Sequence, residues 1–600
     1  MISTRDLHIR LIAIAGLALS PAAAAAPDTG FVAEAETALA RGDGIAAGLA
    51  VRRALEAGVP RERVAAVAGE AELLQGDLAA ARRWLAPGRF ARGTGARGFQ
   101  ALARLQIQQG DLAAATRAYD RALEQGGASA GLWVEIGRLR YRVGEHHLAL
   151  AAVAKAMEID AREPRALEFR GQLVRDARGP VAALPWFERA LEKLPDDLGL
   201  LGEYAATLAE AGRHKDMLGV VRRMVELDPR HPRPYFLQAV LAARAGQDDL
   251  ARRLLARAAD AYDEVPAGRL LAGILELRTG NPVLAVDEFD ELVRRQPDHA
   301  AATLLLGRAL LAGGEAREVV ARLGPAAERN DASPYLLALV GRAHEQLGDR
   351  QAAARYLDRA GGSRPAVLTV LPVDPDGELS LWRAGDQPDR AEVMVPSLRR
   401  LLAQGRRGEA LTLAARMERR YAGSADVETL TGDVALLTGN PAAALAQYER
   451  AAEIRRDFAL VERMVAALRM LGREDAAIGL LADYIALNPR VGSASALLGR
   501  IMAQRGDWRT GAILMDHARD LGGGSDPRLL ADLAEAELAS GNAQAAQEHA
   551  DRAYSLQRAN SRIAAVLARA LAAQGADDGR AEALTAKARQ GPARTGPAQR

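Results

Sequence analysis

Glycine recurs along this chain every 34 residues, and this period restricts the possible folds more than any other feature of the sequence. A first series ends at residue 348 and breaks once, where Arg178 is followed by Gly179. A second series, in a slightly looser step, begins at residue 405. Together the two series consist of Gly42, Gly76, Gly110, Gly144, Gly212, Gly246, Gly280, Gly314, Gly348, Gly405, Gly439, Gly472, Gly506, Gly541 and Gly575. Such a period predicts a stack of small units rather than one globular core.

The unit itself is clearest over residues 96–127. Apolar residues recur there at helical spacing in two short segments joined by the polar turn 109–111. Small side chains, Ala103 and Ala115, stand where the two helices have to touch. Neither helix alone can bury its apolar stripe, so the sequence predicts an all-α fold in which each unit packs on its neighbours.

Other columns keep the same register as the glycines. A small residue usually precedes the glycine by seven positions, an alanine usually follows by five, and a larger side chain often follows by nine. Examples of the larger side chains are Tyr119, Phe187, Phe289, Leu357 and Tyr448. We expect small residues to let paired helices approach closely while the large one fills the space beside them.

This pattern resembles the tetratricopeptide repeat family, whose unit is a 34-residue helix–turn–helix. The family's first-helix tryptophan and tyrosine have counterparts at Trp133 and Tyr141. The resemblance implies a right-handed superhelical solenoid of about sixteen repeats over residues 28–594. A hydrophobic content of 49% with only 4% aromatic residues fits such a helical protein.

Five segments are predicted along the chain. Residues 1–26 read as a secretory signal peptide, with basic residues, an apolar stretch and a small-residue exit in that order. Residues 28–367 and 391–594 form an N-terminal array of about ten repeats and a C-terminal array of about six. Residues 595–600 form a disordered tail. The alternative for the first segment is an uncleaved N-terminal anchor.

The segment 368–390 differs from the repeats around it. It is rich in β-branched residues, and Asp376-Gly377 marks a turn between two extended stretches. This pattern indicates either a short hairpin or a linker between the arrays, and a functional loop is a third reading.

The sequence favours a periplasmic or secreted protein without catalytic chemistry. The chain has no cysteine, which excludes disulfides and an N-terminal lipid anchor on cysteine. A net charge of +2 gives no bulk attraction to nucleic acid. His146 and His147 are adjacent and point in different directions on a helix, so they do not share a metal. We therefore expect no enzyme activity, no catalytic residues, no metal and no cofactor.

A binding face is the remaining candidate for function. In the resembling family the first helix of each repeat lines a concave groove. The position six residues before each periodic glycine is expected on that face, and arginine recurs at this position. The candidate groove residues are Arg104, Arg138, Tyr141, Arg142, Arg165, Arg175, Phe236, Arg308, Tyr335, Arg342 and Arg500. The alternative is that these arginines only solubilise the surface or pair with neighbours such as Glu168 and Glu345.

The groove is predicted to be basic at both ends and apolar in the middle, where Val240 and Ile274 replace arginine. This favours a non-enzymatic scaffold of the bacterial cell envelope that binds a partner protein or peptide, within an envelope-assembly or exopolysaccharide-export system. The alternative is a solenoid that binds an anionic polysaccharide. Salt separates the two, because charge-led polymer binding weakens steeply with ionic strength.

Overall fold

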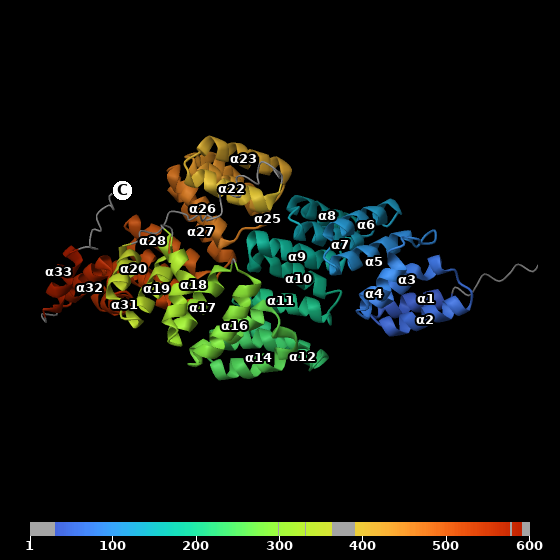
Figure 1. Ribbon diagram of the computed structural model, residues 1–600, viewed down its shortest axis with the longest axis horizontal. Coiled ribbons are helices and arrows are strands. Elements are labelled where there is room, and N and C mark those ends of the chain that lie inside the picture. The colour runs from blue at the N-terminus through green and yellow to red at the C-terminus, as the bar shows by residue number, and fades with distance from the viewer. Residues whose placement is uncertain (1–29, 298, 330–331, 363–389, 576–578, 591–600) are drawn as a thin grey trace, which may run out of the picture. The chain divides into compact units, whose positions relative to one another are not determined.

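Helices make up the protein in its computed structural model (Figure 1). The structure describes residues 30–297, 299–329, 332–362, 390–575 and 579–590. The predicted signal peptide, almost all of the 368–390 insertion and the predicted tail lie outside these residues. Within them there is no β-strand, and the all-α prediction is confirmed.

The chain divides into two compact units, residues 1–132 and 133–600, and each is described by itself. The first unit contains three helix–turn–helix pairs. Its helices are α1 (Gly30–Ala40), α2 (Gly44–Glu56), α3 (Arg61–Leu74), α4 (Leu78–Leu85), α5 (Gly95–Gln108) and α6 (Leu112–Glu124). Small aliphatic residues such as Ala50, Val64 and Val67 form its core.

The second unit begins within α7 and contains two arrays, which we call the leading array (α7–α20) and the trailing array (α22–α33). The leading array consists of α7 (Ala130–Arg142), α8 (His146–Ile159), α9 (Pro164–Arg178), α10 (Pro180–Leu191), α11 (Leu198–Glu210), α12 (His214–Leu227), α13 (Pro232–Arg244), α14 (Asp248–Tyr262), α15 (Pro266–Arg278), α16 (Pro282–Arg295), α17 (Ala300–Ala312), α18 (Ala316–Glu328), α19 (Pro334–Gln346) and α20 (Arg350–Gly362).

The trailing array resumes after the undescribed segment. It consists of α22 (Ala391–Ala403), α23 (Arg407–Arg420), α24 (Ala425–Leu437), α25 (Pro441–Ile454), α26 (Phe458–Met470), α27 (Glu474–Leu487), α28 (Gly492–Gln504), α29 (Trp508–Asp520), the short 3₁₀ turn η1 (Gly523–Ser525), α30 (Pro527–Ala539), α31 (Ala543–Leu556), α32 (Ser561–Ala573) and α33 (Arg580–Gln590). The described helices thus form ten pairs in α1–α20 and six in α22–α33, which matches about sixteen predicted repeats.

The turn of each pair explains the glycine period. Every glycine of the two series has a φ between +71° and +91°, a region that side chains of L-residues rarely adopt. In the α5–α6 turn, Gly110 is followed by Asp111, whose side chain accepts a hydrogen bond of 2.9 Å from the N–H of Ala114 and so caps α6. The break at Arg178 has a simple cause. Helix α9 continues through that position and Gly179 ends it with a φ of +106°.

The small column and the large column meet inside each repeat. A Cβ atom on Gly273 would lie 2.6 Å from the ring of Phe289, and one on Gly432 would lie 2.5 Å from the ring of Tyr448. Both rings are fully buried. Glycine is therefore required because the ring of the second helix lies directly against the backbone of the first.

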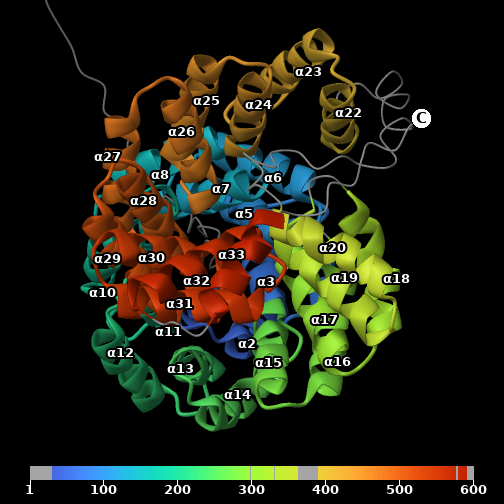
Figure 2. The same ribbon diagram turned by 90° about the vertical axis from the view of Figure 1, so that its left-hand side faces the viewer.

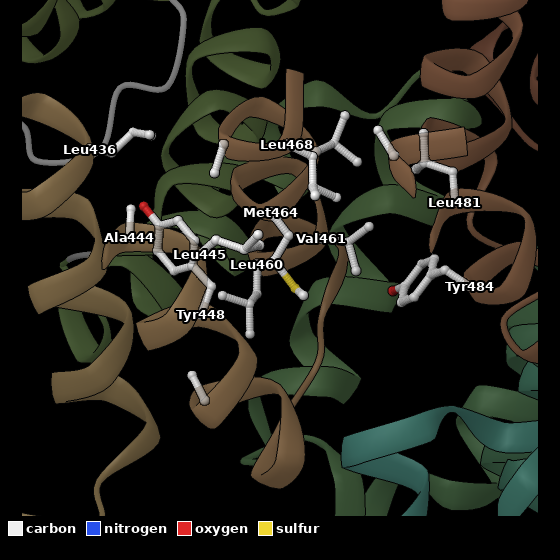
Figure 3. Close-up of a cluster of buried hydrophobic side chains, with 14 of the residues drawn as sticks. Leu436, Ala444, Leu445, Tyr448, Leu460, Val461, Met464, Leu468, Leu481 and Tyr484 are labelled. Carbon is white, nitrogen blue, oxygen red and sulfur yellow. The ribbon is translucent and has the colours of Figure 1, made fainter. Parts of the chain in front are cut away.

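The core of the trailing array surrounds Tyr448, Leu460, Met464 and Tyr484 (Figure 3). The hydroxyl of Tyr448 donates to the buried carboxylate of Asp433 at 2.7 Å.

The guanidinium of Arg463 donates to the same oxygen of Asp433 at 2.9 Å. Burial outweighs both contacts and raises the pKa of Asp433 to about 6.

Candidate functional site

The leading and trailing arrays contact each other at a place that we call the array junction. Helix α25 lies beside α9, and α27 contacts α10 (Figure 1). Four hydrogen-bonded contacts define the junction. The N–H of Ala425 donates to Nδ1 of His146 at 3.0 Å, and the N–H of Arg456 donates to the carbonyl of Asp176 at 2.8 Å. In the third, the N–H of His147 donates to the carbonyl of Gly423 at 3.3 Å. In the fourth, Nη1 of Arg490 lies 3.2 Å from Nε2 of His214.

The two arrays also touch near the end of the leading array (Figure 2). The guanidinium of Arg342 on α19 donates to the carbonyl of Leu556 at 3.0 Å. The side-chain amide of Gln557 donates to the carbonyl of Ala360 at 3.4 Å. The two arrays are therefore in contact at two separate stretches of the leading array.

A polar cavity of 530 Å³ lies at the array junction. The leading array contributes Arg175, Asp176, Glu203 and Glu210 to its wall, and the trailing array contributes residues 455–457 with Tyr484 and Asn488. Arginines and carboxylates therefore face each other across it.

Burial and neighbouring arginines together set the pKa values of the acids of this cavity. For Glu203, burial alone would raise the pKa, but the hydrogen bond from Arg233 and the charges of Arg175 and Arg233 outweigh it and lower the pKa. The carboxyl of Glu210 lacks such a hydrogen bond, and burial raises its pKa. Burial also raises the pKa of Tyr484 to about 12. The cavity wall is thus held together largely by charges of the chain itself.

Most of the predicted groove arginines in the second unit are paired within the chain. Arg138 lies 3.3 Å from Glu168, and Arg165 contacts both Glu168 at 2.9 Å and Asp197 at 2.5 Å. These contacts agree with the alternative reading of the sequence, in which the arginines pair with neighbours such as Glu168.

Two more predicted arginines are paired in the same way. Arg175 donates to the hydroxyl of Thr207 at 3.1 Å and lies 3.2 Å from Glu203. Arg500 of the trailing array donates to Asp532 at 2.5 Å.

The predicted aromatic residues have different surroundings. The hydroxyl of Tyr141 donates to Asp176 at 2.6 Å, and its ring packs against the hydrophobic core of the trailing array. Phe236 on α13 is half-buried and stacks on Tyr262, with ring centroids 4.0 Å apart. Tyr335 on α19 is 47% exposed.

The remaining predicted residues do not join this group. Arg142 and Arg308 are exposed, and in the described part of the chain neither has a hydrogen bond or an ion pair. Arg104 is half-buried in α5 of the first unit. The structure therefore brings Tyr141 and Arg175 to the array junction and leaves the other candidates spread over several helices.

Sequence reasoning missed His146, His214 and Arg456 as residues that join the arrays. The partners of His146 and His214 lie 279 and 276 positions away along the chain. No local pattern marks such a contact. The only available signal was the position of each histidine directly after the turn of its repeat.

Three segments of the chain match the sequence model of a known repeat family. The sequence model of the tetratricopeptide repeat matches residues 101–164, 270–318 and 398–458. These segments include turn glycines with a positive φ, such as Gly110 and Gly280. The chain is a tetratricopeptide repeat protein.

Several solved structures are similar to parts of this chain. PilF of Pseudomonas aeruginosa is 18% identical, with 35% of this chain and 95% of that one covered and a TM-score of 0.30. Human IFIT1 is 17% identical, with 66% and 90% covered and a TM-score of 0.35. YrrB, which is described as having an unusual peptide-binding site, is 15% identical, with 31% and 96% covered and a TM-score of 0.25. No curated protein matches the sequence.

The tetratricopeptide repeats of this chain suggest a scaffold for protein–protein interaction. Among the described residues, no group of three or more His, Asp or Glu side chains could hold a metal ion. None of the helices that the structure describes is long and apolar enough to cross a membrane.

One stretch of first helices differs in kind from the array junction. On α13, α15 and α17 several apolar side chains are half-buried, and we call this set the apolar face. Its members are Phe236, Val240, Leu270, Ile274, Leu277, Leu304 and Leu311. In the described part of the chain, no hydrogen bond joins α13 through α17 to the trailing array.

Proposed function

We propose that this tetratricopeptide repeat protein is a non-enzymatic scaffold that binds a partner protein or peptide on the apolar face. The observation that carries the proposal is the set of half-buried apolar side chains on α13, α15 and α17, together with the exposed Arg308 on α17 and the exposed Tyr335 on α19. Apolar side chains together with an exposed cation and an aromatic ring have the composition of a protein-binding surface.

The partner segment follows from this chemistry. Its apolar side chains cover Ile274 and its neighbours, and a carboxylate pairs with the exposed guanidinium of Arg308. The arginines that could have attracted an anionic polysaccharide are largely neutralised by carboxylates of the same chain, such as Glu168 and Glu203. Charge therefore favours the protein partner over the polymer.

The proposal includes a setting. The charge and hydropathy pattern of residues 1–26 supports export, so we place the scaffold in the periplasm or outside the cell. There it serves as an adaptor in an envelope-assembly or exopolysaccharide-export system.

Site-specific photo-crosslinking tests the proposal in bacterial cells that make the full chain. A photoreactive phenylalanine analogue replaces Ile274, or, as a control, the exposed Arg253 on the second helix α14. We expect a discrete adduct from position 274, identified by mass spectrometry, and none from position 253. Equal adducts at both positions, or none at position 274, would contradict the proposal.

A further inference from the structure

The array junction has a specific requirement for neutral histidines. His146 accepts the N–H of Ala425, and a backbone amide can only donate. Nδ1 of His146 must therefore carry no proton in the closed arrangement. Ser424 is the residue before α24, and its side chain does not cap that helix. The imidazole of His146 caps α24 instead of the Ser424 side chain.

His214 is subject to the same constraint at the other end of the junction. Its partner Arg490 has only donors, so Nε2 of His214 must be the acceptor and the proton must lie on Nδ1. That Nδ1 is buried and has no hydrogen-bond partner among the described residues. A second proton on this ring would put an N–H against the guanidinium of Arg490.

We propose that the array junction is an acid-sensitive latch, which is closed while His146 and His214 are neutral and opens when both take up a proton. Opening separates α8–α12 of the leading array from α24–α27 of the trailing array. This inference is independent of the partner and of the apolar face.

The surroundings of His146 favour its neutral form. Burial is the largest influence and lowers its pKa. Of the charged groups that face it, Asp426 and Asp176 raise the pKa, while Arg455 and His147 lower it. The ring is only 4% exposed. It also lies at the N-terminus of α24, where the helix dipole disfavours a cation.

The surroundings of His214 act in the same direction. Burial comes first, and the positive charges of Arg490 and Arg244 follow; together they lower its pKa. His214 is the first residue of α12, so the dipole of its own helix also disfavours protonation.

A third histidine at the junction works against opening. Nε2 of His147 lies 3.5 Å from the buried carboxylate of Glu428, so its protonation would strengthen that contact. Arg450 faces the same carboxylate at 3.8 Å. The side chain of His147 is 42% exposed, and solvent screens the gain.

The direction of the pH effect follows from linkage. In the open form, both histidines have the ordinary pKa of about 6.5, while in the closed form their pKa is lower. The junction is thus fully stable above pH 6.5 and weakens as the pH falls below it. Between pH 7.5 and 5.0 the open-to-closed ratio rises by up to about 30-fold for each histidine, or about 900-fold for both.

Distance measurements by electron spin resonance test the latch in the full chain. Because the chain has no cysteine, Lys155→Cys on α8 and Arg419→Cys on α23 give two unique spin labels. We expect one narrow distance distribution at pH 7.5 and a longer, broader population at pH 5.0. Circular dichroism should show unchanged helix content at both pH values.

Two substitutions remove the proton sites and keep the acceptors. In His146→Asn the side-chain oxygen replaces Nδ1, and in His214→Gln it replaces Nε2. The double variant should stay closed at pH 5.0, and each single variant should reduce the shift in the ratio by about 30-fold. His549→Gln is the matched control: burial also lowers the pKa of His549, but this residue lies in α31, away from the junction. It should open like the parent.

Three results would overturn the latch. The labelled parent stays closed at pH 5.0, or it loses helix content together with the distance, or a folded single or double variant opens as fully as the parent. The first two results are read from the parent alone, so the test does not depend on the variants folding.

Discussion

The first helices of one repeat type form two different surfaces in the leading array. On α7, α9 and α11 charged side chains pair with each other, and the trailing array contacts this part of the leading array through Asp176 of α9 and His146 of α8. On α13, α15 and α17 the equivalent stretch is apolar and half-buried. The same repeat backbone thus supports a contact with the trailing array in α7–α11 and an exposed surface in α13–α17. The difference depends on side chains at positions that the fold itself does not restrict.

The largest expected effect comes from an aromatic residue of each surface. Tyr141→Ala removes a ring packed on the trailing array and the hydrogen bond to Asp176, so we expect a loss of about 3 kcal/mol in the free energy of unfolding. Phe236→Ala on the apolar face should cost about 1 kcal/mol and weaken partner crosslinking at position 274 instead. Urea unfolding followed by circular dichroism measures both.

Tyr141→Phe is the control for this comparison. It keeps the ring and loses only the hydroxyl, so it should cost about 1 kcal/mol. Equal costs for Tyr141→Ala and Phe236→Ala would show that the two surfaces do not differ in their contacts.

Two arginines give the smaller effect. Arg175→Ala removes an ion pair with Glu203 and should cost about 1 kcal/mol, since Arg233 still pairs with that carboxylate. Arg308→Ala should stay within about 0.5 kcal/mol, because this side chain is exposed. The same urea titration measures the loss in free energy of unfolding for both variants. A loss for Arg308→Ala as large as that for Arg175→Ala would contradict the assignment of Arg308 to an exposed surface.

The repeat pattern predicts the fold well because its causes are local. A positive φ at Gly110 and a ring against Gly273 each restrict the residue type at one position, and the restriction recurs with the period. The candidate site is less predictable. Arginine does recur along the first helices. Whether an arginine such as Arg175 faces solvent or pairs with Glu203 depends on the packing of neighbouring repeats.

The array junction could not be predicted from the sequence. Ala425 and His146 belong to different repeats far apart in the chain, and neither position departs from the repeat pattern. Contacts of this kind depend on how the two arrays curve, which results from small contributions of many repeats.

The most direct test of the account is the hydrogen exchange of two backbone amides at pH 7.5. The N–H of Ala425, at the start of α24, and that of Arg456, beyond the end of α25, donate to the leading array and not to their own helices. Their exchange rates therefore measure the array contact itself. Mass spectrometry with fragmentation to single residues should show both amides protected in the parent and exposed in Tyr141→Ala, with the interior amides of α24 unchanged. Fast exchange of both amides in the parent would contradict the account.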